Sequence, residues 1–98
     1  MVAVSFNVRE RRLVLDGPCW PEDAVGVADA IHEAAGTTQA LVLDLTRITG
    51  VPPEVAGAIT RARCSVEAGG CRVTVWTLPD GSVERDLIDA MRGEAVPT

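Results

Sequence analysis

The stretch from residue 40 to residue 57 most constrains the fold, because it passes from an apolar strand directly into a helix start. Residues 41–45 read Leu-Val-Leu-Asp-Leu, a pattern typical of a strand buried within a sheet. Pro52-Pro53-Glu54 follows after a short turn. Proline suits a first helical turn, because no backbone donor is needed there, and a carboxylate favours the positive end of the helix dipole. Such a junction indicates an α/β domain.

The remaining patterns predict further strands and helices on both sides of this junction. Val4, Phe6 and Val8 alternate with polar residues, as in a half-buried strand, and the next strand follows closely enough to form an antiparallel hairpin. Gly36 is expected to end the first helix in the left-handed conformation. The predicted strands cover residues 4–8, 13–16, 41–45 and 71–77, and the predicted helices begin near Pro21, Pro53 and Ser82.

These elements follow one another in the order ββαβαβα. The order predicts an α/β fold with a mixed four-stranded sheet, in which an antiparallel N-terminal hairpin is followed by parallel strands, and about three helices. Right-handed crossovers place the helices on the same side of the sheet. The side chains predicted for the covered face are all apolar, whereas the other face is mixed and includes Val14, Asp16, Val42, Asp44, Thr74 and Trp76. We expect one domain over residues 1–92 and a short tail over 93–98.

Charge and composition argue against several functional classes. The net charge is −5, and the nine cationic residues are all arginines scattered along the chain, which argues against nucleic acid as a partner. No apolar run approaches the roughly 20 residues that a membrane span needs. Three cysteines without Cys-x-x-Cys spacing are typical of reduced thiols. We therefore expect a cytoplasmic location, no nucleic acid and no membrane span.

Reactive side chains are few and poorly spaced for catalysis. His32, Cys64 and Cys71 lack the paired spacing of metal ligands, so no metal site is predicted. Cys19 has no cationic neighbour in the sequence to lower its pKa, and we expect it to serve in packing. With one histidine and no glycine-rich phosphate loop, the sequence predicts neither an enzyme nor a cofactor site.

Residues 40–57 resemble the core of the STAS domain, the fold of bacterial anti-sigma-factor antagonists. In that family the strand reads like Val-Leu-Asp-Leu-Ser, and Asp-Ser-Ser-Gly stands at the helix start, where a partner kinase phosphorylates the second serine. This chain keeps Leu45, Thr46, Ile48 and Thr49 but carries Pro52-Pro53-Glu54-Val55 in place of that motif. The later Gly69-Gly70 and the residues from Pro79 to Leu87 extend the resemblance over most of the chain.

The resemblance implies a non-enzymatic module that regulates a partner by docking through residues 49–61, with an anti-sigma-factor kinase as the partner. Glu54 occupies the position of the phosphorylated serine. Its carboxylate either imitates part of a phosphate's charge or simply suits a helix start, and the second interpretation is favoured. Thr49 is the nearest substitute acceptor, although threonine at a strand end is more often a β-favouring residue. The expected docking residues are Thr49, Pro52, Pro53, Glu54, Gly57 and Arg61.

An alternative function follows from the mixed sheet face. Trp76 is a large aromatic side chain on that face, where it either anchors a homodimer or another protein, or is covered by the N-terminal segment. The chain would then be a scaffold or oligomer-forming subunit of a larger assembly. A small-molecule binder or an enzyme is the weakest hypothesis, because no convergent reactive groups accompany an apolar pocket.

Overall fold

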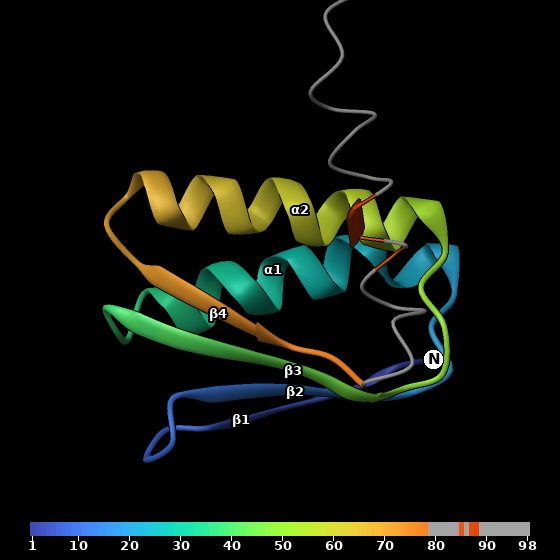
Figure 1. Ribbon diagram of the computed structural model, residues 1–98, viewed down its shortest axis with the longest axis horizontal. Helices are drawn as coiled ribbons and strands as arrows, with labels where there is room; N and C mark the ends of the chain where they lie inside the picture. The colour runs from blue at the N-terminus through green and yellow to red at the C-terminus, as the bar shows by residue number, and fades with distance from the viewer. Residues whose placement is uncertain (79–84, 86, 89–98) are drawn as a thin grey trace, which may run out of the picture.

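The computed structural model describes residues 1–78, 85, 87 and 88, which include a four-stranded sheet with two α-helices packed on one face (Figure 1). The order ββαβαβ agrees with the sequence prediction. The predicted last helix begins outside the described residues, and so does the predicted tail. The elements are β1 (Ala3–Asn7), β2 (Arg12–Gly17), the 3-10 helix η1 (Pro21–Asp23), α1 (Ala24–Ala35), β3 (Ala40–Ile48), α2 (Pro53–Ala68) and β4 (Arg72–Trp76).

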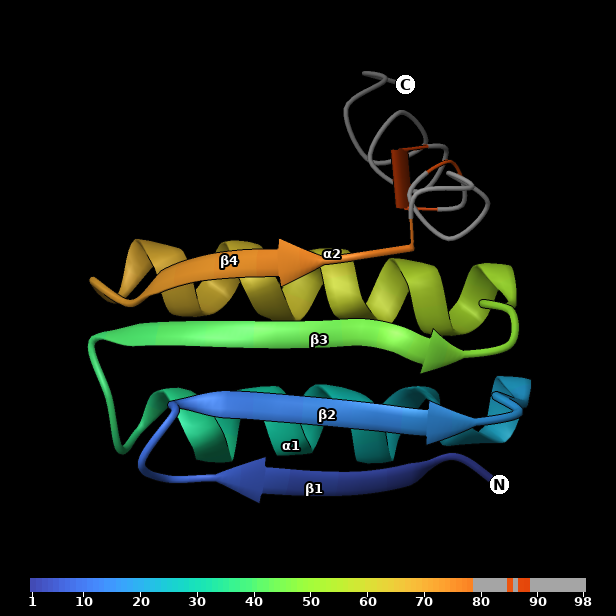
Figure 2. The ribbon, with the colours of Figure 1, turned by 60° about the horizontal axis from the view of Figure 1, so that its bottom comes forward.

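The strands lie in the order β1-β2-β3-β4. β1 pairs with β2 antiparallel, and β2, β3 and β4 are parallel, so the predicted mixed α/β sheet is confirmed. Both α-helices cover the same face, as expected from right-handed crossovers (Figures 1 and 2). The opposite face is left open by the described residues.

The hydrophobic core fills the space between the sheet and the helices. Apolar residues of the three parallel strands point into it: Leu13 pairs with Leu43, and Leu41 pairs with Val73. On α2 the apolar residues Val55, Ile59, Ala62 and Val66, spaced four, three and four positions apart, are all buried. The largest side chains that are fully buried are Leu13, Leu15, Ile31, Leu41, Leu43, Leu45, Ile59, Val27 and Val55.

The two α-helices end differently. Gly36 has φ −67° and ψ −16°, so the prediction of a left-handed residue there is wrong. The chain instead continues its right-handed turn, because both the backbone N–H and the hydroxyl of Thr37 donate to the carbonyl of Ala34, at 3.1 and 2.8 Å. At the end of α2 the left-handed residue is Gly70, with φ +99°, which confirms that Gly69-Gly70 ends that helix.

β3 contains a bulge that the sequence did not reveal. Val14 lies opposite Asp44 but Asp16 lies opposite Arg47, so β3 has one extra residue between these pairs. The carboxylate of Asp44 stabilises the irregular backbone, because one oxygen accepts hydrogen bonds from the backbone N–H of Thr46 at 2.9 Å and from its hydroxyl at 2.6 Å. Asp44 therefore serves as a structural hydrogen-bond acceptor.

Candidate docking site

The carboxyl ends of β2, β3 and β4 lie at one edge of the molecule (Figure 2). The segments at these strand ends cover residues 16–22, 46–54 and 77–81. The first two are joined by a hydrogen bond from the backbone N–H of Thr49 to the carbonyl of Gly17, at 3.3 Å. Of the third loop, only Thr77 and Leu78 are among the described residues.

Residues 49–54, here called the junction, connect β3 to α2. Val51 and Val55 are buried on either side of the helix start and fix the junction to the core. The carbonyl of Pro52 accepts the first hydrogen bond of α2, from the N–H of Ala56 at 2.9 Å. Pro53 and Glu54 therefore project from a firmly held backbone, and both are exposed.

A hollow of about 300 Å³ lies beside the junction. Asp23 organises the loop that forms its other wall, because the Asp23 carboxylate accepts hydrogen bonds from the backbone N–H groups of Trp20, at 2.8 Å, and Val2, at 3.2 Å. The bond from Trp20 is the main reason why the pKa of Asp23 lies below its ordinary value of 3.8. Trp20 itself is 52% exposed at this edge. The hollow is lined by Pro18, Cys19, Thr49, Gly50, Val51 and Pro52.

Cys19 is the reactive residue nearest the junction. Burial raises the pKa of its thiol, and the negative charge of Asp23 raises it further. The side chain is half-buried and packs against the core, in agreement with the expected packing role. A protonated thiol is a poor nucleophile, so the raised pKa makes Cys19 less reactive.

Two predicted docking residues lie further along α2. Arg61 is exposed, but Gly57 is buried, so the expectation that Gly57 lies on the exposed side of the helix is wrong. The reason is that the Arg61 guanidinium folds over it: a Cβ on Gly57 would lie 3.1 Å from an Nη atom of Arg61. The surface offered here is that of Arg61.

The open sheet face carries a cluster that sequence analysis found only in part. Trp76 is 44% exposed, and the guanidinium of Arg12 lies 5.8 Å from the centre of its ring. Arg12 also forms an ion pair with Glu10 at 2.9 Å, and its Nε lies 3.9 Å from an oxygen of Asp44. Arg12 was not expected on this face, because the predicted strand began at residue 13 and left Arg12 in the turn. Every second residue of a strand lies on the same face, so Arg12 shares the open face with Val14 and Asp16.

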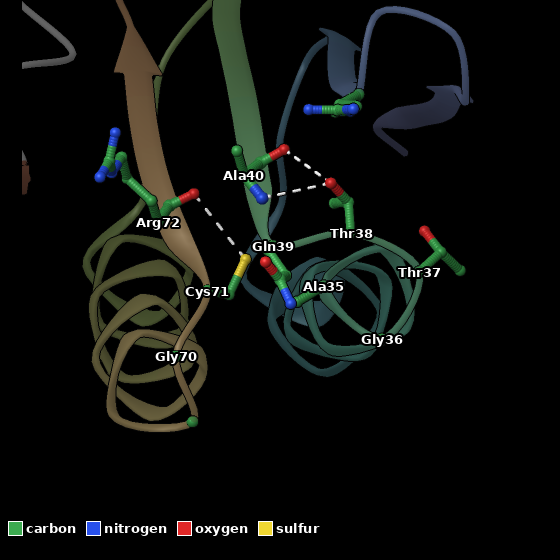
Figure 3. A pocket seen from close by; sticks show the side chains of 11 residues that line it. Ala35, Gly36, Thr37, Thr38, Gln39, Ala40, Gly70, Cys71 and Arg72 are labelled. Carbon is green, nitrogen blue, oxygen red and sulfur yellow. Dashed lines mark hydrogen bonds between the residues drawn. The ribbon is translucent and has the colours of Figure 1, made fainter.

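A hollow of about 950 Å³ lies at the opposite edge, where α1 and α2 end (Figure 3). The positively charged Arg11 and Arg72 line it. The carboxyl ends of α1 and α2, which are the negative ends of the two helix dipoles, line it as well. The Thr38 hydroxyl is used locally, because it donates to the carbonyl of Ala40 at 3.0 Å and accepts from its N–H at 3.2 Å (Figure 3). This edge therefore shows no arrangement that favours one ligand.

The residues considered for a metal site are not brought together. His32 lines a groove between α1 and α2, whereas Cys64 lines a hollow between α2 and β4. In the part of the chain that the structure describes, no group of three or more histidine, cysteine, aspartate or glutamate side chains is placed to hold a metal ion. Among the same residues, no helix combines the length and apolar character needed to cross a membrane.

Comparison with known proteins identifies the fold. The sequence matches no protein-family profile and no curated protein. One similar solved structure is the complex of the diguanylate cyclase SiaD with its activator SiaC, from Pseudomonas aeruginosa. The match has a TM-score of 0.63 and 20% sequence identity, and it covers 99% of this chain and 88% of the matched chain. A structure of SiaC alone matches with the same TM-score and sequence identity, and the match covers 97% of this chain and 84% of SiaC.

A third solved structure, of Mglu, matches with a TM-score of 0.61 and 24% identity, covering 79% of this chain and 19% of Mglu. Identities this low show a shared fold and nothing more. Together with the strand order, the matches to SiaC confirm the STAS-like α/β fold that the sequence predicted.

Proposed function

We propose that this chain is a non-enzymatic protein-binding module that regulates a partner by docking through residues 49–61. The observation that carries the proposal is the junction, where exposed Pro53 and Glu54 stand on a backbone fixed by buried Val51 and Val55. A surface held in one conformation loses little entropy on binding. SiaC, which has the same fold, activates SiaD in the complex described above, which supports a regulatory role.

The STAS resemblance favours an anti-sigma-factor kinase as the partner. Glu54 stands where the family carries its phosphorylated serine, so the charge at this position is permanent and docking is not switched by phosphorylation there. Arg61 provides a positive charge two turns further along α2. Binding would then depend on the amount of each protein rather than on modification of this residue.

The surroundings of the junction support a non-enzymatic role. Cys19 has a raised pKa, and the single histidine of the chain, His32, lies in the groove between the helices and does not line the hollow beside the junction. A nucleophile and a base within hydrogen-bonding distance are the minimum for covalent catalysis. The described residues around the junction offer no such pair.

Calorimetric titration against an anti-sigma-factor kinase from the same organism tests the proposal. We expect Glu54→Arg to weaken binding at least about tenfold, because reversing a charge inside a protein interface opposes its electrostatic complementarity. Glu33→Arg is the matched control, since Glu33 is exposed on α1 and gives the same change in net charge. Absence of binding by the unmodified chain, or an equal loss in both variants, would reject the proposal.

The scaffold alternative is supported by Trp76, which is 44% exposed on the open sheet face. If that face holds an assembly together, Trp76→Ala removes self-association and leaves binding through the junction unchanged. If the docking proposal is right, this variant leaves kinase binding intact.

A further inference from the structure

β1 forms one edge of the sheet, and none of the described residues pairs with its outer side (Figure 2). The strand reads Ala-Val-Ser-Phe-Asn and contains no charged residue and no proline. Edge strands expose unpaired backbone donors and acceptors, and proteins usually protect them with charges, proline or bulges. β1 carries none of these devices and its partner β2 is in regular register with it throughout.

The other edge strand differs in this respect. β4 begins at Arg72, which is exposed, and it has a charged side chain that opposes pairing with another strand. Since one edge is protected and the other is not, the unprotected edge is the better candidate for association through strand pairing.

The side chains of β1 suit a second copy of the same strand. Val4 lies opposite Leu15 and Phe6 opposite Leu13, so both point to the helix-covered face. Val4 is nevertheless 43% exposed, and Phe6 is only partly buried. An antiparallel copy centred on Ser5, the midpoint of β1, sets each Val4 against the Phe6 of the other copy. Aromatic and β-branched side chains are favourable cross-strand partners.

The charges at the two ends of β1 are also complementary. Arg9 and Arg11 are exposed in the turn that follows β1, while Glu10 is paired with Arg12. The other end of β1 lies beside η1, where Val2 contacts Asp23 and the neighbouring Glu22 is exposed. Antiparallel pairing brings the exposed arginines of each copy toward the end of the other that carries Glu22, where the α-amino group of Met1 offsets part of the negative charge, and does so twice.

We propose that a second copy of this chain pairs with β1, antiparallel and about a two-fold axis at Ser5, so that the two sheets become one. The helices of both copies then lie on the same face. Because the strand directions of the two copies are opposite, their junctions lie at opposite ends of the assembly and both stay uncovered. This association is independent of the proposed docking function and does not involve Trp76.

The interface is small, because β1 has only five residues. Small interfaces belong to weak, transient complexes, so the expected dissociation constant is micromolar rather than nanomolar. The association should therefore be sought over a concentration series and not at a single dilute concentration.

Sedimentation velocity of the full chain, from low micromolar to several hundred micromolar, tests the proposal. We expect the unmodified protein to pass from monomer to dimer. Ser5→Asp and Ser5→Lys should each weaken dimerisation at least about tenfold, since like charges then face each other across the axis. An equimolar mixture of the two variants should dimerise again, because opposite charges now meet. Thr74→Asp, at an exposed site on the other edge strand, should dimerise as the unmodified protein does.

Several results would overturn the proposal: a monomer at every concentration, dimerisation unaffected by either Ser5 variant, or a mixture that stays monomeric. Loss of the dimer in Thr74→Asp would also do so, because it would move the interface to β4 or the open face. Amide hydrogen exchange of the unmodified protein gives a test that needs no variant. Exchange should slow, as the concentration rises, at those of Val4, Ser5 and Phe6 whose N–H points away from β2, and unchanged exchange at all three contradicts the pairing.

Discussion

The junction and the open sheet face both expose large or charged side chains, but they use them differently. On the open face the polar groups engage one another: Asp44 binds Thr46, and Arg12 lies between Glu10 and Trp76. At the junction, Pro53 and Glu54 project from a helix start whose packing is supplied by buried residues beneath them. Exposure alone therefore does not mark a binding surface. What distinguishes the junction is an exposed surface on a fixed base.

The largest expected effect concerns that base. Ile48 is 3% exposed at the end of β3 and packs into the core directly before the junction. Ile48→Ala should lower the free energy of unfolding by about 2–5 kcal/mol, through lost burial and the cavity left behind. Val42→Ala, on the half-buried open face, should cost less than about 1 kcal/mol. Urea unfolding of both variants checks this, and equal losses would show that the open face is packed as tightly as the base of the junction.

A smaller loss is expected when the hydrogen bonds of the bulge are removed. Asp44→Ala leaves the backbone N–H of Thr46 without its acceptor, which should cost about 1–3 kcal/mol. Thr46→Val is the partial control, because it removes only the hydroxyl bond and leaves the carboxylate bond to the backbone in place. If Asp44→Ala unfolds at the same denaturant concentration as the unmodified chain, the carboxylate does not stabilise the bulge.

The loop beside the junction should make stability depend on pH. The folded-state pKa of Asp23 is lowered, so its contribution is complete above the ordinary value of 3.8 and is lost as the pH falls through the folded-state pKa. Asp23→Asn should remove this dependence. The measurement is the midpoint of thermal unfolding between pH 6 and pH 2. A variant that keeps the same acid sensitivity as the unmodified chain would assign that sensitivity to other carboxylates.

The smallest effect on stability is expected at Trp76. Trp76→Ala removes the ring from over Arg12 and should cost about 0.5–1 kcal/mol, the range for a cation–π contact at an exposed site. Arg12→Lys keeps the charge and tests the contact from the other side. Chemical unfolding compared with Thr74→Ala, a neighbouring exposed position, gives the measurement. A loss several times larger would show that the ring is part of the packed structure and not a surface residue.

Most of the fold could be predicted because the hydrophobic patterns are regular. Leu13, Leu15, Leu41 and Leu43 alternate with polar or smaller residues, and proline and glycine mark the limits of α2. The bulge in β3 could not be predicted. Leu45 and Ile48 are both apolar, so the extra residue does not visibly interrupt the apolar pattern of the strand. Gly36 was misjudged since Thr37, not the glycine, closes the turn after α1.

The candidate site was predicted less well than the fold. The junction, with its exposed Pro53 and Glu54, could be located from the predicted helix start. The burial of Gly57 depends on where the Arg61 side chain lies, and sequence spacing does not determine this. The loop that forms one wall of the hollow beside the junction is held by Asp23, which binds the nearby backbone of Trp20 and also the backbone of Val2, a contact between segments far apart in the chain. Such contacts can be found only once the fold is known.

Mapping the surface that a partner covers tests the central claim most directly. Amide chemical shifts of the isotope-labelled chain should be followed while an anti-sigma-factor kinase from the same organism is added. The account predicts that the largest changes fall within residues 49–61, with small changes at Val14, Val42 and Thr74 on the open face. Changes concentrated on the open face, or none at residues 49–61, would contradict it.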